Sequence, residues 1–180
     1  MRWERLFDDI EAQFAAQERL ERDAEIAERT RAERGRITLG QRLLGSLGER
    51  VSAQVRGLGP VEAVVEECGQ GWVVLAPDPR RLILVPTAAL VSVSGLARPR
   101  SSSTIARRLS LGYALRAISR DRRPIAIYDV EANLTHGTID EVGADYLVVS
   151  EHPLDEPRRA ENVRATRVIP FAVIGAVASG

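Results

Sequence analysis

The chain has 180 residues, 44% of them hydrophobic, and 25 acidic against 25 basic side chains, so its formal net charge is zero. This length suits one domain or two small ones with a buried core, and the neutral balance excludes a general attraction of the whole molecule to polyanions. No apolar run approaches the roughly 20 residues of a membrane span and the N-terminus lacks a signal-peptide core, so we expect a cytoplasmic protein without membrane contact.

Residues 1–34 predict one long amphipathic helix. No proline or glycine interrupts residues 2–34, and apolar side chains recur there every three or four positions, which places them on one stripe. A helix of this length measures about 45 Å at 1.5 Å per residue, which is too long for a small domain to cover. We therefore expect its aromatic first half to contact a partner protein or a second copy, with packing on its own domain as the alternative. The predicted interface residues are Trp3, Leu6, Phe7, Ile10 and Phe14.

From residue 35 onward the sequence predicts the same unit twice. Each unit opens with a short helix, because Thr38 and Ser110 are good N-cap residues directly before an apolar repeat of helical period. After each helix the apolar period changes to two, which indicates strands. The first set of strands is predicted at residues 51–55, 61–67, 72–76, 82–85 and 90–93, and the second at 125–128, 134–141, 146–150, 163–169 and 174–178.

The two copies differ in length at one place. Trp72 and Tyr146 are equivalent positions 74 residues apart, whereas Pro86 and Pro170 are equivalent positions 84 residues apart. The ten additional residues of the second copy fall in "EHPLDEPRRAEN", which is polar and contains proline. We expect this insertion to form a surface loop.

This order of elements predicts a mainly β protein with helices. A lone sheet of five strands leaves open edges and an uncovered face unless it closes on itself. The expected fold is therefore a long N-terminal helix followed by two five-stranded antiparallel barrels, each with an N-terminal capping helix, and this order of elements resembles the SH3/Sm-like small barrels. The expected boundaries are 1–34 for the helix, 35–97 for the first barrel, 98–107 for an Arg/Ser-rich linker and 108–180 for the second barrel.

A helix followed by five strands, with a short helical turn before the fifth, resembles the Sm-like branch of the small barrels. The most specific stretch is "HGTIDEVGADYLVVSE", where Gly137, Gly143 and Tyr146 fall as in the first Sm motif. The whole chain is also similar to a group of proteins from high-GC Gram-positive bacteria, some labelled transcriptional regulators. The resemblance implies RNA binding or a role in transcription. However, the turn Gly143-Ala144-Asp145 lacks the asparagine of the Sm uridine pocket, so uridine readout in the Sm manner is not expected.

No catalytic or metal-binding pattern is predicted. The two histidines, His136 and His152, have no cysteine or carboxylate at a recurrent zinc spacing around them. Adjacent acids such as Asp140 and Glu141 would point to opposite faces of a strand, so we expect solvated strand ends rather than a joint site. Cys68 fills an apolar position and is expected in the core. We therefore expect no cofactor, no metal and no enzymatic activity.

The basic residues are concentrated around the second helix. Residues 98–123 contain eight arginines and one acid, whereas residues 124–180 contain four arginines and nine acids. On a helix, Arg116, Arg120 and Arg123 would lie opposite the apolar stripe and face outward, which suits phosphate contacts. The alternative is that these arginines pair with the acids of residues 1–34 or of the second copy. The candidate nucleic-acid-binding residues are Arg107, Arg108, Arg116, Arg120, Arg122 and Arg123.

Two functions of different classes follow. The leading hypothesis is a non-enzymatic regulator that binds RNA or the transcription apparatus through the arginines of the second unit. The alternative is a protein adaptor or scaffold that docks, or associates with itself, through residues 1–34.

Overall fold

The computed structural model describes residues 17, 19, 21–32, 35–97, 109–156 and 158–179. Internal contacts divide the chain into two compact units, Met1–Thr38 and Leu39–Gly180. In the first unit residues 21–32 are helical and mostly exposed. The aromatic half of the predicted partner helix lies outside the described residues, and this applies to Trp3, Leu6, Phe7, Ile10 and Phe14.

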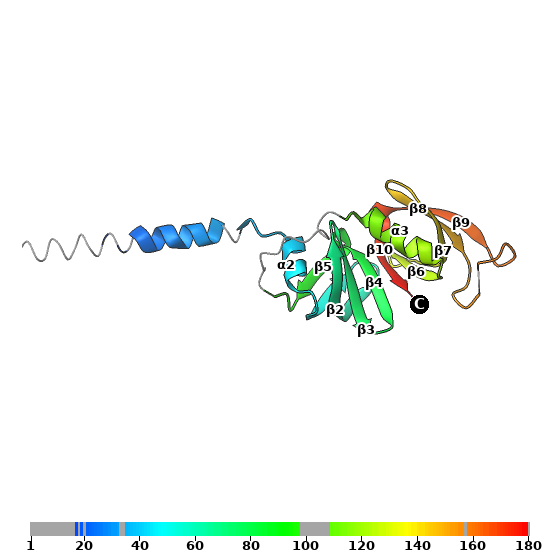
Figure 1. Cartoon of the computed structure of the whole chain (residues 1–180), viewed down its shortest axis with the longest axis horizontal. Coiled ribbons are helices and arrows are strands. Elements are labelled where there is room, and N and C mark those ends of the chain that lie inside the picture. Colours follow the sequence, from blue (N-terminus) through cyan, green and yellow to red (C-terminus); the bar gives the residue numbers. More distant parts are fainter. Residues whose placement is uncertain are drawn as a thin grey trace, which may run out of the picture. The chain divides into compact units, whose positions relative to one another are not determined.

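The second unit contains all ten strands (Figure 1). Its first half consists of α2 (Leu39–Gly45), β1 (Arg50–Val55), β2 (Gly59–Gly69), β3 (Trp72–Asp78), β4 (Arg81–Pro86), the 3-10 turn η1 (Thr87–Ala89) and β5 (Leu90–Ser94). Its second half consists of α3 (Leu111–Asp121), β6 (Ile125–Asp129), β7 (Leu134–Val142), β8 (Tyr146–Glu151), β9 (Ala165–Pro170), the 3-10 turn η3 (Phe171–Val173) and β10 (Ile174–Ser179). The ten predicted strands are confirmed, with ends that differ by at most two residues.

The strands form where apolar residues alternate. In β1 the side chains of Val51, Ala53 and Val55 are buried while their neighbours are more exposed, and β2 continues the same face with Ala63 and Val65. A strand with this alternation buries one face and leaves the other to solvent. Among the described residues, no helix is both long enough and apolar enough to cross a membrane.

The prediction of a long helix followed by two separate barrels is wrong. All ten strands belong to one open antiparallel sheet, in the order β5-β1-β2-β3-β4-β10-β6-β7-β8-β9. The halves join because β4 pairs with β10, with Leu84 opposite Val177 and Ile83 opposite Ala178. An unpaired strand edge is unfavourable, and here each half supplies the edge that the other half leaves open. Closure of each half on itself is therefore replaced by pairing between the halves.

Both halves nevertheless pair their strands in the same internal order, β5-β1-β2-β3-β4 in the first and β10-β6-β7-β8-β9 in the second. Ala53 faces Val61 in the first half, and the residues 74 positions later, Ile127 and Thr135, face each other in the second half. The turns η1 and η3 are 84 residues apart. The five strands and the 3-10 turn of one half thus have structural equivalents in the other.

The hydrophobic core consists of two buried clusters, and each receives side chains from both halves. The cluster around α2 and β1–β5 includes Ala126, Ala176 and Ala178 from the second half. The cluster around α3 and β6–β10 includes Trp72 and Leu84 from the first half. The two clusters therefore depend on the junction between β4 and β10.

Helix α3 begins beside the first half. The hydroxyl of Ser110 accepts a hydrogen bond from the backbone nitrogen of Tyr113, which confirms the predicted N-cap. Directly before the helix, the backbone of Leu109 accepts a hydrogen bond from the indole nitrogen of Trp72 at 2.8 Å, and Ser110 forms a β-bridge with Gln70. These contacts tie the start of α3 to the turn between β2 and β3.

Candidate functional site

The outer face of α3 and the residues that follow it carry an exposed group of arginines, which we call the arginine face. The inner side of the helix buries Gly112, Ala114 and Leu115, so the predicted orientation of the helix is confirmed. The arginine face consists of Arg116, Arg120, Arg122 and Arg123, which are all exposed. The other two candidate residues, Arg107 and Arg108, lie outside the described residues.

No arginine of this face forms an ion pair in the described part of the chain. The ion pairs of the second unit join Arg158 to Asp140 and Arg167 to Glu151, and neither pair involves an arginine of α3. Among the described residues, the arginine face therefore forms no ion pair with acids of the second half, which was one of the two alternatives; the other was pairing with the acids of residues 1–34. The guanidinium groups remain accessible to an external anion.

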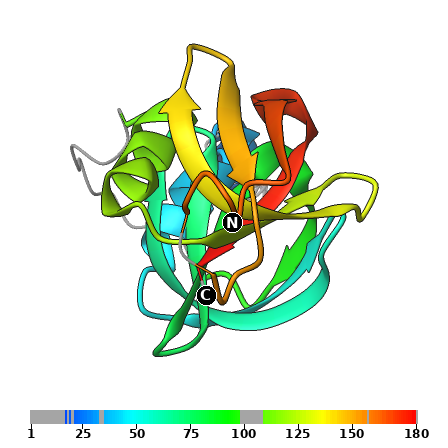
Figure 2. The same ribbon diagram turned by 90° about the vertical axis from the view of Figure 1, so that its right-hand side faces the viewer.

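A hollow of about 350 Å³ lies between the end of α3 and β7. Helix and strand lie side by side (Figure 2), and the hydroxyl of Ser119 donates a hydrogen bond to the backbone oxygen of Ile139 at 3.2 Å, which fixes the helix against the strand. The lining residues are Ser119, Arg120 and Arg122 from the helix side and Thr138, Ile139 and Asp140 from the strand. Two members of the arginine face therefore form one wall of a concave surface.

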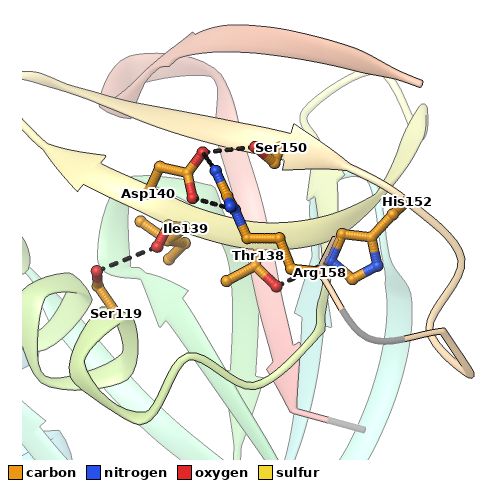
Figure 3. A network of polar contacts seen from close by, with 7 residues as sticks. All are labelled: Ser119, Thr138, Ile139, Asp140, Ser150, His152 and Arg158. Carbon is orange, nitrogen blue, oxygen red and sulfur yellow. Dashed lines mark hydrogen bonds and ion pairs between the residues drawn. The ribbon is translucent and has the colours of Figure 1, made fainter. Parts of the chain in front are cut away.

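The carboxylate in this hollow, Asp140, forms an ion pair and hydrogen bonds with other residues of the same unit (Figure 3). Arg158 holds it with two contacts, Nε to Oδ1 at 2.6 Å and Nη2 to Oδ2 at 2.9 Å, and the hydroxyl of Ser150 donates to Oδ2. A two-point contact of this kind between arginine and a carboxylate is strong and directional. The negative charge of Asp140 is therefore compensated mainly by Arg158, with a further contribution from the charge of Arg122, so Arg120 and Arg122 leave the hollow with a surplus of positive charge.

The pKa of Asp140 reflects this arrangement. Burial by itself raises the pKa of this carboxyl, but the hydrogen bonds from Arg158 and Ser150 and the charges of Arg158 and Arg122 outweigh it, so the pKa lies below its ordinary value. The same pairing raises the pKa of Arg158. Both groups therefore stay charged at neutral pH.

A buried histidine supports the adjacent loop. His152 is 1% exposed, its Nδ1 lies 2.8 Å from the backbone oxygen of Pro153, and its Nε2 lies 2.9 Å from the hydroxyl of Thr138. A carbonyl oxygen can only accept, so Nδ1 donates to the Pro153 oxygen, and Nε2 forms the second hydrogen bond of the ring with the Thr138 hydroxyl. Both ring nitrogens are used within the fold. Among the described residues, no three His, Cys, Asp or Glu side chains group as a metal site would require.

Asp140 and Glu141 are exposed near the end of β7, as predicted. Their polar contacts were not predicted from the sequence: Asp140 is held by Arg158, and Glu141 accepts a hydrogen bond from the Tyr146 hydroxyl at 3.0 Å. The available signal was the insertion of the second copy, since it supplies both Arg158 and His152. The loop that distinguishes the two copies is therefore anchored against β7 and β8.

A second concave surface lies where the halves meet, with a volume of about 410 Å³. Its floor is apolar and includes Trp72, Leu84 and Val177, and its lining includes Arg123 together with Asp121. Glu66 and Glu67 also line it, so its acidic residues make it less suited to an anion than the hollow beside β7.

No known protein-family model matches this sequence, and a search of curated proteins found no matching relative.

Proposed function

We propose that this is a non-enzymatic nucleic-acid-binding protein whose arginine face contacts the phosphate backbone. The single observation that carries the proposal is that Arg116, Arg120, Arg122 and Arg123 are exposed together and that none of them forms an ion pair among the described residues. A guanidinium group offers a planar fork of donors that matches phosphate oxygens, and backbone contacts of this kind account for much of the affinity for nucleic acids.

The hollow beside β7 places part of this positive charge on a concave surface. Arg120 and Arg122 line it, and the acid at its far side, Asp140, is already paired with Arg158. A phosphate group there would meet positive charge without facing an uncompensated carboxylate. Tyr113, 45% exposed, is the one large exposed aromatic side chain among the described residues of α3. Stacking on bases is therefore a minor contribution, and we infer binding with little sequence specificity.

RNA is the favoured nucleic acid, because the hairpin of β7 and β8 contains the stretch that resembles the first Sm motif. A regulatory role connected with transcription and a cytoplasmic location belong to the same proposal. The adaptor function through residues 1–34 is the second candidate, and it is favoured by Ile26, which is 57% exposed on the helical residues 21–32.

The test is binding of the full chain to a single-stranded RNA at several salt concentrations. Simultaneous replacement of three exposed arginines, R116A, R120A and R123A, should weaken binding and lower the slope of log affinity against log salt by about 2, since each phosphate contact on a single strand contributes roughly 0.7. Fluorescence anisotropy measures both quantities.

The matched control removes three exposed arginines from the first half, R50A, R56A and R81A, and keeps the same net charge as the test variant. It should bind like the unaltered chain. Equal affinity and equal salt slope for the test variant and the control would refute the nucleic-acid proposal and favour the adaptor.

A further inference from the structure

The junction between the two halves depends on glycine at two points of close approach. A Cβ atom added to Gly175, in β10, would lie far closer than 3.0 Å to the backbone oxygen of Arg56 in the first half. A Cβ atom added to Gly57 would meet the backbone oxygen of Asp129, in β6, even more closely. Real Cβ atoms essentially never approach other atoms within 3.0 Å. The halves can therefore meet in this way only because these two positions lack a side chain.

The sheet ends in two edges that are the equivalents of the strands joined in its middle. In the sheet β5 has only β1 as a neighbour, and β9 has only β8. By the 84-residue offset, β9 corresponds to β4 and β5 corresponds to β10. Leu84 and Val177 face each other at the inner junction, and their equivalents are Val168, which is 65% exposed, and Val93. The same pairing could thus be repeated between the β9 edge of one chain and the β5 edge of another.

The outer edges differ from the inner junction at the positions that matter for close approach. The equivalent of Gly175 is Val91, which is 63% exposed on β5. The equivalent of Gly57, by the 74-residue offset, is Glu131. A third difference concerns the strand pairing itself. Ile83 of β4 is buried where β4 pairs with β10, whereas its equivalent in β9 is the exposed, charged Arg167.

We propose that Val91, Glu131 and Arg167 prevent two copies of the chain from pairing through their outer edges. The junction between halves therefore forms once within each chain and is not repeated from chain to chain. Two copies meeting edge to edge would bring the side chain of Val91 against the backbone of the other chain at the place where Gly175 has none. Arg167 would have to leave its ion pair with Glu151 and take the position that the buried Ile83 occupies at the inner junction. Charged and bulky residues at exposed edges are a known means of preventing such pairing.

The decisive experiment exchanges the blocking residues for their inner equivalents. The full chain carrying V91G, E131G and R167I should form head-to-tail oligomers whose size increases with concentration, while the unaltered chain gains no association through these edges. To report the register, V93C and V168C are added to both proteins, since opposite residues of paired strands come within the Cα separation that a disulfide spans. Oxidation should give a ladder of covalently linked chains for the triple variant alone.

The matched control places comparable substitutions, L154G, E156G and R159I, at exposed residues of the inserted loop outside both edge strands, again with V93C and V168C. It should give no ladder. Circular dichroism checks that each variant keeps its sheet. The proposal is overturned if the folded triple variant gives no ladder, or if the unaltered edges already link Val93 to Val168 positions between chains.

Discussion

One pair of charged side chains contributes to holding the insertion of the second half against β7. Arg158 belongs to the inserted loop and contacts Asp140 of β7 through two nitrogens. The side chains are 40% and 28% exposed, so water screens the interaction, and its contribution to stability is modest. Its main effect is to fix the loop and to compensate a carboxylate beside the arginine face.

We predict that D140N lowers the free energy of unfolding by about 0.5–1 kcal/mol at pH 7. Because the pKa of Asp140 is lowered in the folded state, the difference from the unaltered chain should be complete above its ordinary value of 3.8 and disappear as the pH falls through the lower folded value. Urea denaturation between pH 7 and pH 3 measures this. The exposed Asp155 of the same loop provides the control D155N, and an equal pH-dependent loss in that variant would contradict the assignment.

At the scale of the element, α3 ends on an arginine in a conformation that usually requires glycine. Arg122 is the C-cap residue, with φ 48° and ψ 25° in the left-handed region. Helices commonly end with glycine in this region because a Cβ atom is unfavourable there. An arginine at this position therefore costs stability, and it places a guanidinium group at the rim of the hollow beside β7.

We expect R122G to act in opposite directions on stability and on binding. Relief of the left-handed conformation should raise the free energy of unfolding by about 0.5–1 kcal/mol, whereas loss of the guanidinium group should weaken RNA binding. The neighbouring R123G removes a charge at a residue without positive φ, so it should weaken binding without the gain in stability. Thermal denaturation and anisotropy separate the two effects, and a destabilised R122G would show that the cap carries no strain.

At the scale of the whole second unit, one sheet and two shared clusters connect residues that lie far apart in the sequence. Leu84, 3% exposed, belongs to the first half but packs in the cluster of the second half. A loss of packing at this position therefore weakens both halves. The unit should unfold in a single transition rather than half by half.

The prediction compares two equivalent positions. L84A should lower the free energy of unfolding by about 2–4 kcal/mol because it leaves a cavity at the buried junction. V168A, at the equivalent position on the open edge, should change it by no more than about 0.5 kcal/mol. Scanning calorimetry should show one heat-absorption peak for both variants. Two peaks in the unaltered chain would contradict the coupling.

Local patterns predicted the strands, the N-cap at Ser110 and the outward arginines, because period and capping act over a few residues. They did not predict the pairing of β4 with β10, which joins residues about 90 positions apart in the sequence. One signal was present: residues 82–85 are apolar at four successive positions, as expected of a strand covered on both faces, whereas the equivalent β9 contains Thr166 and Arg167. For the contact between Arg158 and Asp140, the insertion predicted only that a loop exists. The path of that loop could not be predicted, since periodicity does not encode it.

The chain contains two tryptophans, and one of them sits where α3 meets the first half. Trp72 is 2% exposed, and its indole nitrogen is bonded to the backbone just before the basic helix. Indole emission responds to the polarity around the ring, so Trp72 is an intrinsic fluorophore at the point where the helix is attached. A displacement of the start of α3 from the first half should therefore change the tryptophan fluorescence, which can be measured without an added label.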